Sequence, residues 1–238
     1  MEEKFRLGFH SIVVACFTIA SIWALFLCDF ENVTDDRVLD MQKYGGRYFT
    51  TWNFLFQLVY FSLALSEDFL LIYTPCESCL KTISKFKGYI FTSFVVPYTT
   101  YVFVVFWSLF KYDRELVFPS ATDEVVPLWF NHMVHTVPLV FMVFEFYFTE
   151  RNVLPDWRRI LVGFSIMTAA YFTILFHTKS KTGRYFYGIF HLLAPWQIII
   201  FIISSYFLAL LVIKGGIYIQ QLVQMSKNPV VSCIRKIS

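Results

Sequence analysis

Residues 194–213 read APWQIIIFIISSYFLALLVI, a run that contains no charged side chain. A run of about 20 predominantly apolar residues is long enough to cross the hydrocarbon core of a bilayer as a helix. Lipid offers no hydrogen-bond partners to the backbone, and a helix satisfies its own amides and carbonyls. This run therefore predicts a membrane-spanning helix and sets the class of the protein.

Five further windows share the length and the low charge of residues 194–213. None of them shows the strict alternation that barrel strands require. We therefore expect an all-α polytopic membrane protein, with one membrane-embedded domain over residues 1–238 built as a bundle of six transmembrane helices. The other five expected spans cover residues 9–27, 48–66, 89–110, 128–148 and 160–176.

The composition of the whole chain agrees with this class. Hydrophobic residues make up 57% and charged residues 16% of the 238 residues, and the mean hydropathy is +0.58. Soluble domains average about 45–50% apolar and about 25% charged residues, so both values argue against a soluble enzyme. The net charge of +3 is too small to predict a nucleic-acid-binding surface.

The distribution of Lys and Arg predicts the orientation in the membrane. If the N-terminus is cytoplasmic, 12 Lys and Arg residues flank the inner ends of the spans and eight lie in outer loops. The inner set includes Arg151, Arg235 and Lys236. The same orientation places the glycosylation sequon that begins at Asn32 outside, so we expect both termini in the cytoplasm.

Polar residues cluster at the start of the window 128–148. Asn131 and His135 are four residues apart and share one helix face, as do His132 and Thr136. Polar groups within spans normally face the interior of a bundle or a wet cavity. The two histidines are therefore the first candidates for chemistry, although hydrogen bonding to neighbouring helices is the default interpretation from spacing alone.

A metal site and a general base are the two functional interpretations of these histidines. A metal would need further ligands, and no carboxylate lies at suitable helical spacing; His191 is the other histidine that might join. We therefore expect neither a metal nor another cofactor. A general base needs a proton donor within hydrogen-bond reach.

Thr50 can provide that donor. It lies near the outer end of the window 48–66, and His135 lies about two turns from the outer end of the window 128–148. Their similar depths allow the two side chains to meet, whereas Thr51 projects about 100° away from Thr50. Threonines in spans often bond their own backbone carbonyls, so geometry permits this pair without selecting it.

Several motifs in order resemble the androgen-induced-gene family, and together they extend over nearly the whole chain. The two most specific are the YDRE segment and the W-x-N-H-x-x-H-T segment. The motifs are Tyr44-Gly45-Gly46, Thr50 with Gln57, Tyr112-Asp113-Arg114-Glu115-Leu116-Val117-Phe118-Pro119, residues 127–136, and Thr182-Gly183-Arg184-Tyr185-Phe186-Tyr187.

This resemblance implies a multi-pass membrane hydrolase that cleaves fatty acid esters of hydroxy fatty acids. It implies that Thr50 is the nucleophile and His135 the histidine that serves it. The segment between Gly46 and Thr50 is shorter than in the family, which keeps Thr51 as the alternative nucleophile. The segment after Gly183 also departs from the family pattern, which puts substrate contacts there in doubt.

The implied mechanism needs further groups around the ester. We expect Asn131, or with less support His132, to contact the substrate or its oxyanion. No carboxylate is identified by its spacing as the group that orients the histidine; Asp113 and Glu115 are candidates, and a solvated ion-pair cluster with Arg114 is the alternative for them. The implied partner is a lipid ester that enters from the bilayer, in the endoplasmic reticulum, another endomembrane or the plasma membrane. The alternative class is a membrane protein without enzymatic activity that binds lipids or regulates another protein.

The predicted orientation is tested by cysteine accessibility. A single cysteine introduced as Asp35→Cys, in a background without the native cysteines, should react with an impermeant maleimide added outside intact cells. A cysteine introduced as Thr82→Cys should react only after permeabilisation. External labelling at position 82 instead of position 35 would reverse the orientation.

Overall fold

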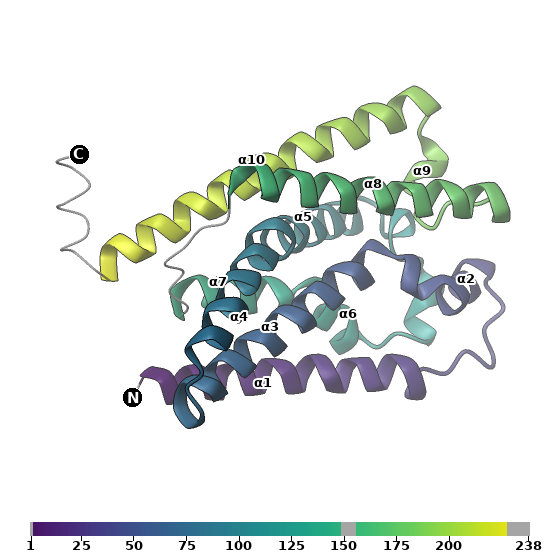
Figure 1. Cartoon of the computed structure of the whole chain (residues 1–238). Coiled ribbons are helices and arrows are strands. Elements are labelled where there is room, and N and C mark those ends of the chain that lie inside the picture. Colours follow the sequence, from purple (N-terminus) through teal and green to yellow (C-terminus); the bar gives the residue numbers. More distant parts are fainter. Residues whose placement is uncertain (1, 149–155, 228–238) are drawn as a thin grey trace.

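The computed structural model of the chain describes residues 2–148 and 156–227, and helices dominate it (Figure 1). No strand occurs in these two ranges. Five helical stretches are long and apolar enough to cross a membrane. The fold class is therefore confirmed as an all-α, multi-pass integral membrane protein. The five stretches are Glu3–Leu27, Asp36–Tyr73, Glu77–Tyr112, Trp157–Thr182 and Pro195–Ser226.

The window 128–148 is also helical, but it is broken in the middle. Helix α6 runs over Leu128–His135 and α7 over Val137–Phe148, with Thr136 between them. Pro138 has no backbone N–H, and its ring would clash with the carbonyl four residues earlier, so an unbroken helix is disfavoured here. The six expected spans thus correspond to five continuous helical stretches and one interrupted pair.

The span that contains Pro97 stays helical because a π-helical turn precedes the proline. Helix α4 (Glu77–Ile90) passes through the π-turn η3 (Phe91–Val95) into α5 (Val96–Tyr112). The wider turn lies directly before Pro97, where a proline removes one α-helical hydrogen bond. A second π-turn, η1 (Trp23–Leu27), extends α1 (Glu2–Ile22).

The helices extend beyond the apolar windows. Helix α3 runs over Phe49–Tyr73, α8 over Trp157–Thr182 and α10 over Pro195–Lys227. The start of α1 and the end of α10 lie at one end of the bundle (Figure 1). The short helices α2 (Asp36–Tyr44) and α9 (Ile189–Leu192) lie at the opposite end. Of the basic residues that predicted the orientation, Arg151, Arg235 and Lys236 lie outside the described ranges.

Buried ionic groups join three helices at the end of the bundle where α1 begins. His10 on α1 contacts Asp68 on α3 through Nδ1, at 2.6 Å, and Glu145 on α7 through Nε2, at 2.9 Å. All three side chains have no exposed surface. Arg6 donates to the other oxygen of Asp68 at 2.6 Å, and Tyr60 donates to Glu145. We call these five residues the ionic cluster.

Ion pairs also join the loops at the opposite end, but these are exposed to water. Arg37 of α2 contacts Glu115 of the α5–α6 connection at 2.7 Å. Arg184, which follows α8, contacts Asp36 at 2.9 Å and Asp40 at 3.2 Å. These contacts hold α2 against the α5–α6 connection and against the segment that follows α8.

The ionic cluster predicts a large stability effect for His10→Ala. Removing the imidazole leaves two buried carboxylates without their shared partner, and breaking a buried pair costs about 3–5 kcal/mol. The free energy of unfolding should fall by that amount, measured by SDS-induced unfolding in mixed micelles. Arg37→Ala is the matched control, because an exposed pair contributes about 0–1 kcal/mol. Equal losses for the two variants would contradict the role assigned to the cluster.

Candidate active site

A cavity of about 390 Å³ opens between the helices near the end that carries α2 and α9. Its walls come from α1, α3, α5, α6, α8, α9, α10 and the adjoining loops. Most lining side chains are aliphatic or aromatic, as ligand cavities generally are. The few polar groups in its wall are therefore the places where chemistry can occur. The apolar lining includes Phe54, Leu55, Val102, Phe106, Phe164 and Ala209.

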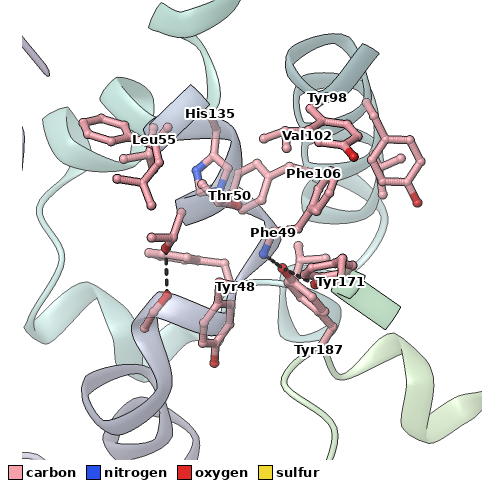
Figure 2. A pocket seen from close by; sticks show the side chains of 18 of the residues that line it. Tyr48, Phe49, Thr50, Leu55, Tyr98, Val102, Phe106, His135, Tyr171 and Tyr187 are labelled. Atoms are coloured by element: carbon pink, nitrogen blue, oxygen red, sulfur yellow. Dashed lines mark hydrogen bonds between the residues drawn. The ribbon is translucent and has the colours of Figure 1, made fainter. Parts of the chain in front are cut away.

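Thr50 and His135 meet in the wall of this cavity (Figure 2). Thr50 is the second residue of α3, and His135 is the last residue of α6. The Thr50 hydroxyl lies 3.2 Å from Nε2 of His135. The helix break at Thr136 lies directly after His135, so the imidazole projects from a helix end. The arrangement provides a hydroxyl and a base in direct contact beside an apolar space.

The protonation of His135 follows from its second nitrogen. Nδ1 lies 3.0 Å from the backbone carbonyl oxygen of Asn131 and 2.8 Å from its side-chain oxygen. A backbone carbonyl only accepts, so Nδ1 carries the proton of the neutral ring. Nε2 then has a free lone pair and accepts a hydrogen bond from the Thr50 hydroxyl. The ring of Phe106 stacks on the imidazole at 3.5 Å, with 8° between the planes, and restricts its rotation.

Asn131 therefore contacts the base through its oxygen. Its side chain is 3% exposed and lies one turn before His135 on the same face of α6. The spacing of four residues was the signal in the sequence for this contact. The candidate orienting groups were Asp113 and Glu115, but the structure engages both elsewhere: Glu115 contacts Arg37, and Asp113 accepts the Glu115 amide at 3.0 Å.

The neighbouring Thr51 and His132 have other partners. The Thr51 hydroxyl donates to the carbonyl oxygen of Gly45 at 2.7 Å. His132 is exposed, and its Nδ1 lies 3.1 Å from the hydroxyl of Thr136. Trp107 donates to the same hydroxyl at 3.1 Å. These contacts connect α2 with α3 and α5 with the helix break, and neither residue contacts the Thr50–His135 pair.

The histidines do not gather around a metal-binding centre in the described part of the chain. Within residues 2–148 and 156–227, no group of three or more His, Cys, Asp or Glu side chains is arranged to hold a metal ion. His10 belongs to the ionic cluster. His191, the histidine expected to complete such a site, accepts the backbone N–H of Tyr185 at 3.1 Å.

Tyr187 lies at the cavity wall beside the start of α3, and the sequence reasoning assigned it no role. Its hydroxyl accepts the backbone N–H of Phe49 at 3.0 Å (Figure 2). Tyr171 on α8 donates to the same oxygen at 3.5 Å. The family motif that ends at Tyr187 drew attention to this segment, but a tyrosine in a connecting loop belongs to no periodic pattern that would place it at the cavity.

A family model and individual known proteins both match this chain, and they point to the same family. Residues 9–221 match the model of a family described as FAR-17a/AIG1-like protein. The androgen-dependent TFPI-regulating protein of Rattus norvegicus is 36% identical over 195 residues, which cover 79% of this chain and 82% of the relative. Its counterpart from Mus musculus is 34% identical over 177 residues, or 74% of each chain.

A more distant relative belongs to the same group. The androgen-induced gene 1 protein of Homo sapiens is 25% identical over 187 residues, which cover 75% of this chain and 77% of the relative. No solved structure matches the chain.

Proposed function

Because the chain belongs to the FAR-17a/AIG1-like family, we propose that it hydrolyses fatty acid esters of hydroxy fatty acids within the membrane. Thr50 is the nucleophile and His135 the general base. The observation that carries this proposal is the hydrogen bond of 3.2 Å between Thr50 and His135 at the wall of an apolar cavity. A nucleophile in contact with a base that a third group orients is the common signature of covalent hydrolases.

In the first half-reaction Thr50 Oγ1 attacks the carbonyl carbon of the ester. Its proton passes to Nε2 of His135, and the imidazolium then protonates the departing alkoxide. The hydroxy fatty acid leaves, and the other acyl group remains bonded to Thr50. In the second half-reaction water attacks the acyl-threonine and His135 takes a proton from that water. The bond from the acyl carbon to Thr50 Oγ1 then breaks, His135 returns the proton to Thr50 Oγ1, and the fatty acid is released.

Asn131 supports the direction of this proton transfer. Its two oxygens accept Nδ1–H of His135, which keeps the lone pair of Nε2 on the side of Thr50. A histidine oriented by an asparagine also occurs in cysteine proteases of the Cys-His-Asn type. Asn131 thus acts as a positioning residue for the base.

The environment of the pair suits a lipid ester. The cavity wall is predominantly apolar, which suits contact with acyl-chain segments beside the reacting carbonyl. Exposed ion pairs join α2 to neighbouring loops at the end that carries α2 and α9, and we take this end as the entry for the water of the second half-reaction.

The competing proposal is a membrane protein that binds lipids without turning them over. The apolar cavity alone would support that activity. Loss of the threonine or the histidine separates the two proposals, because an enzyme loses turnover whereas a binding protein keeps its ligand.

The first test is a set of four alanine variants in purified, detergent-solubilised protein. Thr50→Ala and His135→Ala should each lower kcat for ester hydrolysis by about 10³-fold or more, because each removes a member of one reacting unit. Thr51→Ala and His132→Ala should keep a substantial part of the activity. Release of fatty acid from the ester is measured by mass spectrometry, with the folded yield of each variant determined in parallel.

A fluorophosphonate probe provides the second readout. It should label the native protein and His132→Ala, but not Thr50→Ala. An inactive Thr51→Ala together with an active Thr50→Ala would move the nucleophile by one residue. Retained turnover in Thr50→Ala and Thr51→Ala alike would refute covalent catalysis by a threonine here.

The proposed chemistry also predicts that no metal is required. A threonine activated by a neutral histidine needs no Lewis acid, so EDTA should leave the rate of ester hydrolysis unchanged. Elemental analysis of the active protein should find zinc and iron well below one atom per chain. Loss of activity in EDTA that one added metal restores would instead favour a metal-activated water.

A further inference from the structure

The hydroxyl of Tyr187 has a proton that no described residue accepts. Its oxygen accepts two hydrogen bonds, from the backbone N–H of Phe49 at 3.0 Å and from the hydroxyl of Tyr171 at 3.5 Å. Within residues 2–148 and 156–227 no acceptor is found for its own O–H. Tyr187 lines the cavity together with Thr50 and His135 (Figure 2), so this proton is available to a ligand there.

The start of α3 offers a second donor beside the first. The first four N–H groups of a helix have no acceptor within it. Phe49 donates to Tyr187, while Thr51 and Trp52 donate to the carbonyl of Tyr48 at 3.1 Å and 3.3 Å. Among the described residues this leaves the N–H of Thr50, the second residue of α3, without a backbone acceptor. The positive end of the helix dipole lies at the same place.

Acyl transfer needs such donors. When Thr50 attacks an ester, the carbonyl oxygen acquires a negative charge, and removing one donor to that oxygen typically lowers kcat by about 10²–10³-fold. Asn131, the residue expected from the sequence to supply a donor, presents its side-chain oxygen to His135. Tyr187 and the start of α3 offer donors on another side of the cavity.

We propose that the hydroxyl of Tyr187 and the backbone N–H of Thr50 form the oxyanion hole of this protein. The proposal rests on the proposed function, since an oxyanion arises only if Thr50 attacks a carbonyl. Tyr187 approaches the N-terminus of α3 within 3.0 Å of Phe49, the residue directly before the nucleophile. Its hydroxyl is thus held beside the amide with which it would share the oxyanion.

The step balances without any change in Tyr187. As the bond from Thr50 Oγ1 to the carbonyl carbon forms, the π electrons move onto the carbonyl oxygen and the threonine proton passes to His135. The oxyanion accepts hydrogen bonds from Tyr187 O–H and Thr50 N–H. The carbonyl then re-forms, the alkoxide leaves with the proton from His135, and Tyr187 keeps its own proton throughout. Burial raises the pKa of Tyr187, which keeps the phenol protonated and able to donate.

A purely structural role is the competing explanation, because Tyr187 also satisfies the N–H of Phe49. The variant Tyr187→Phe removes both functions but keeps the ring. Tyr185→Phe is the matched control: it makes the same change two residues away in the same loop, at a side chain that does not line the cavity. The readouts must therefore separate binding of the ground state from stabilisation of the oxyanion.

Four quantities are measured for the native protein and both variants: kcat and KM for the ester, the affinity for an ether analogue that lacks the carbonyl, and the affinity for a long-chain alkyl trifluoromethyl ketone. The ketone adds the Thr50 hydroxyl and places a hemiketal oxyanion in the hole. For Tyr187→Phe we expect kcat and ketone affinity to fall together by about 10²-fold. KM and ether affinity should stay within about threefold of the native values, and Tyr185→Phe should match the native protein.

A kcat for Tyr187→Phe within about threefold of the native value overturns the proposal, as does an equal loss of ether and ketone affinity. If this variant does not fold, 3,5-difluorotyrosine at position 187 decides, because fluorination lowers the pKa of the phenol and a phenolate cannot donate. The kcat of this variant should then fall at a lower alkaline pH than the kcat of the native protein. An alkaline side of the pH–rate profile that does not move rejects the proposal. A native protein without Thr50-dependent turnover refutes the proposed function itself, whatever Tyr187 does.

Discussion

The packing of the helix bundle depends on the contacts of His10 with two buried carboxylates. The imidazole contacts Asp68 and Glu145 with its two nitrogens, and carboxylate oxygens accept from both only when the ring is doubly protonated. With Arg6, the two positive charges match the two negative ones. Burying an isolated carboxylate among apolar helices is costly, so the partners of Asp68 and Glu145 favour the close packing of α1, α3 and α7.

The same helices carry the ionic cluster at one end of the bundle and the cavity at the other. Helix α3 carries Asp68 near one end and Thr50 at the other, with Gln57 between them. Gln57 donates to the hydroxyl of Thr99 at 2.6 Å and to the carbonyl oxygen of Pro138 at 3.4 Å, so it holds the broken span against α3. The broken span is arranged like α3: Glu145 on α7 belongs to the ionic cluster, whereas His135 on α6 lines the cavity. The packing of one end therefore fixes the depth at which the reactive groups of the other end meet.

The parts of this structure that depend on local pattern could be predicted from the sequence, and the parts that depend on distant partners could not. Runs of low charge revealed the five long helical stretches and the broken pair of α6 and α7. Comparable depth placed Thr50 within reach of His135. The window that ended at residue 66 was too short, because Glu67 and Asp68 interrupt the apolar pattern. Their partners Lys87 and His10 lie on other helices, so burial of these charges has no local signal. The same limit applies to Tyr187, whose position depends on how a loop between two helices returns to the start of α3.

The cavity has a thermodynamic consequence for the folded state. At about 24 cal/mol per Å³, an empty apolar space of about 390 Å³ would cost on the order of 9 kcal/mol. That is comparable to the whole unfolding free energy of a typical domain, about 5–15 kcal/mol. A lipid chain that fills the space binds only the folded protein and shifts the folding equilibrium by linkage. If an acyl chain occupies the cavity as the proposed function requires, the conformational stability of the bundle would depend on the chemical potential of acyl chains in the surrounding membrane.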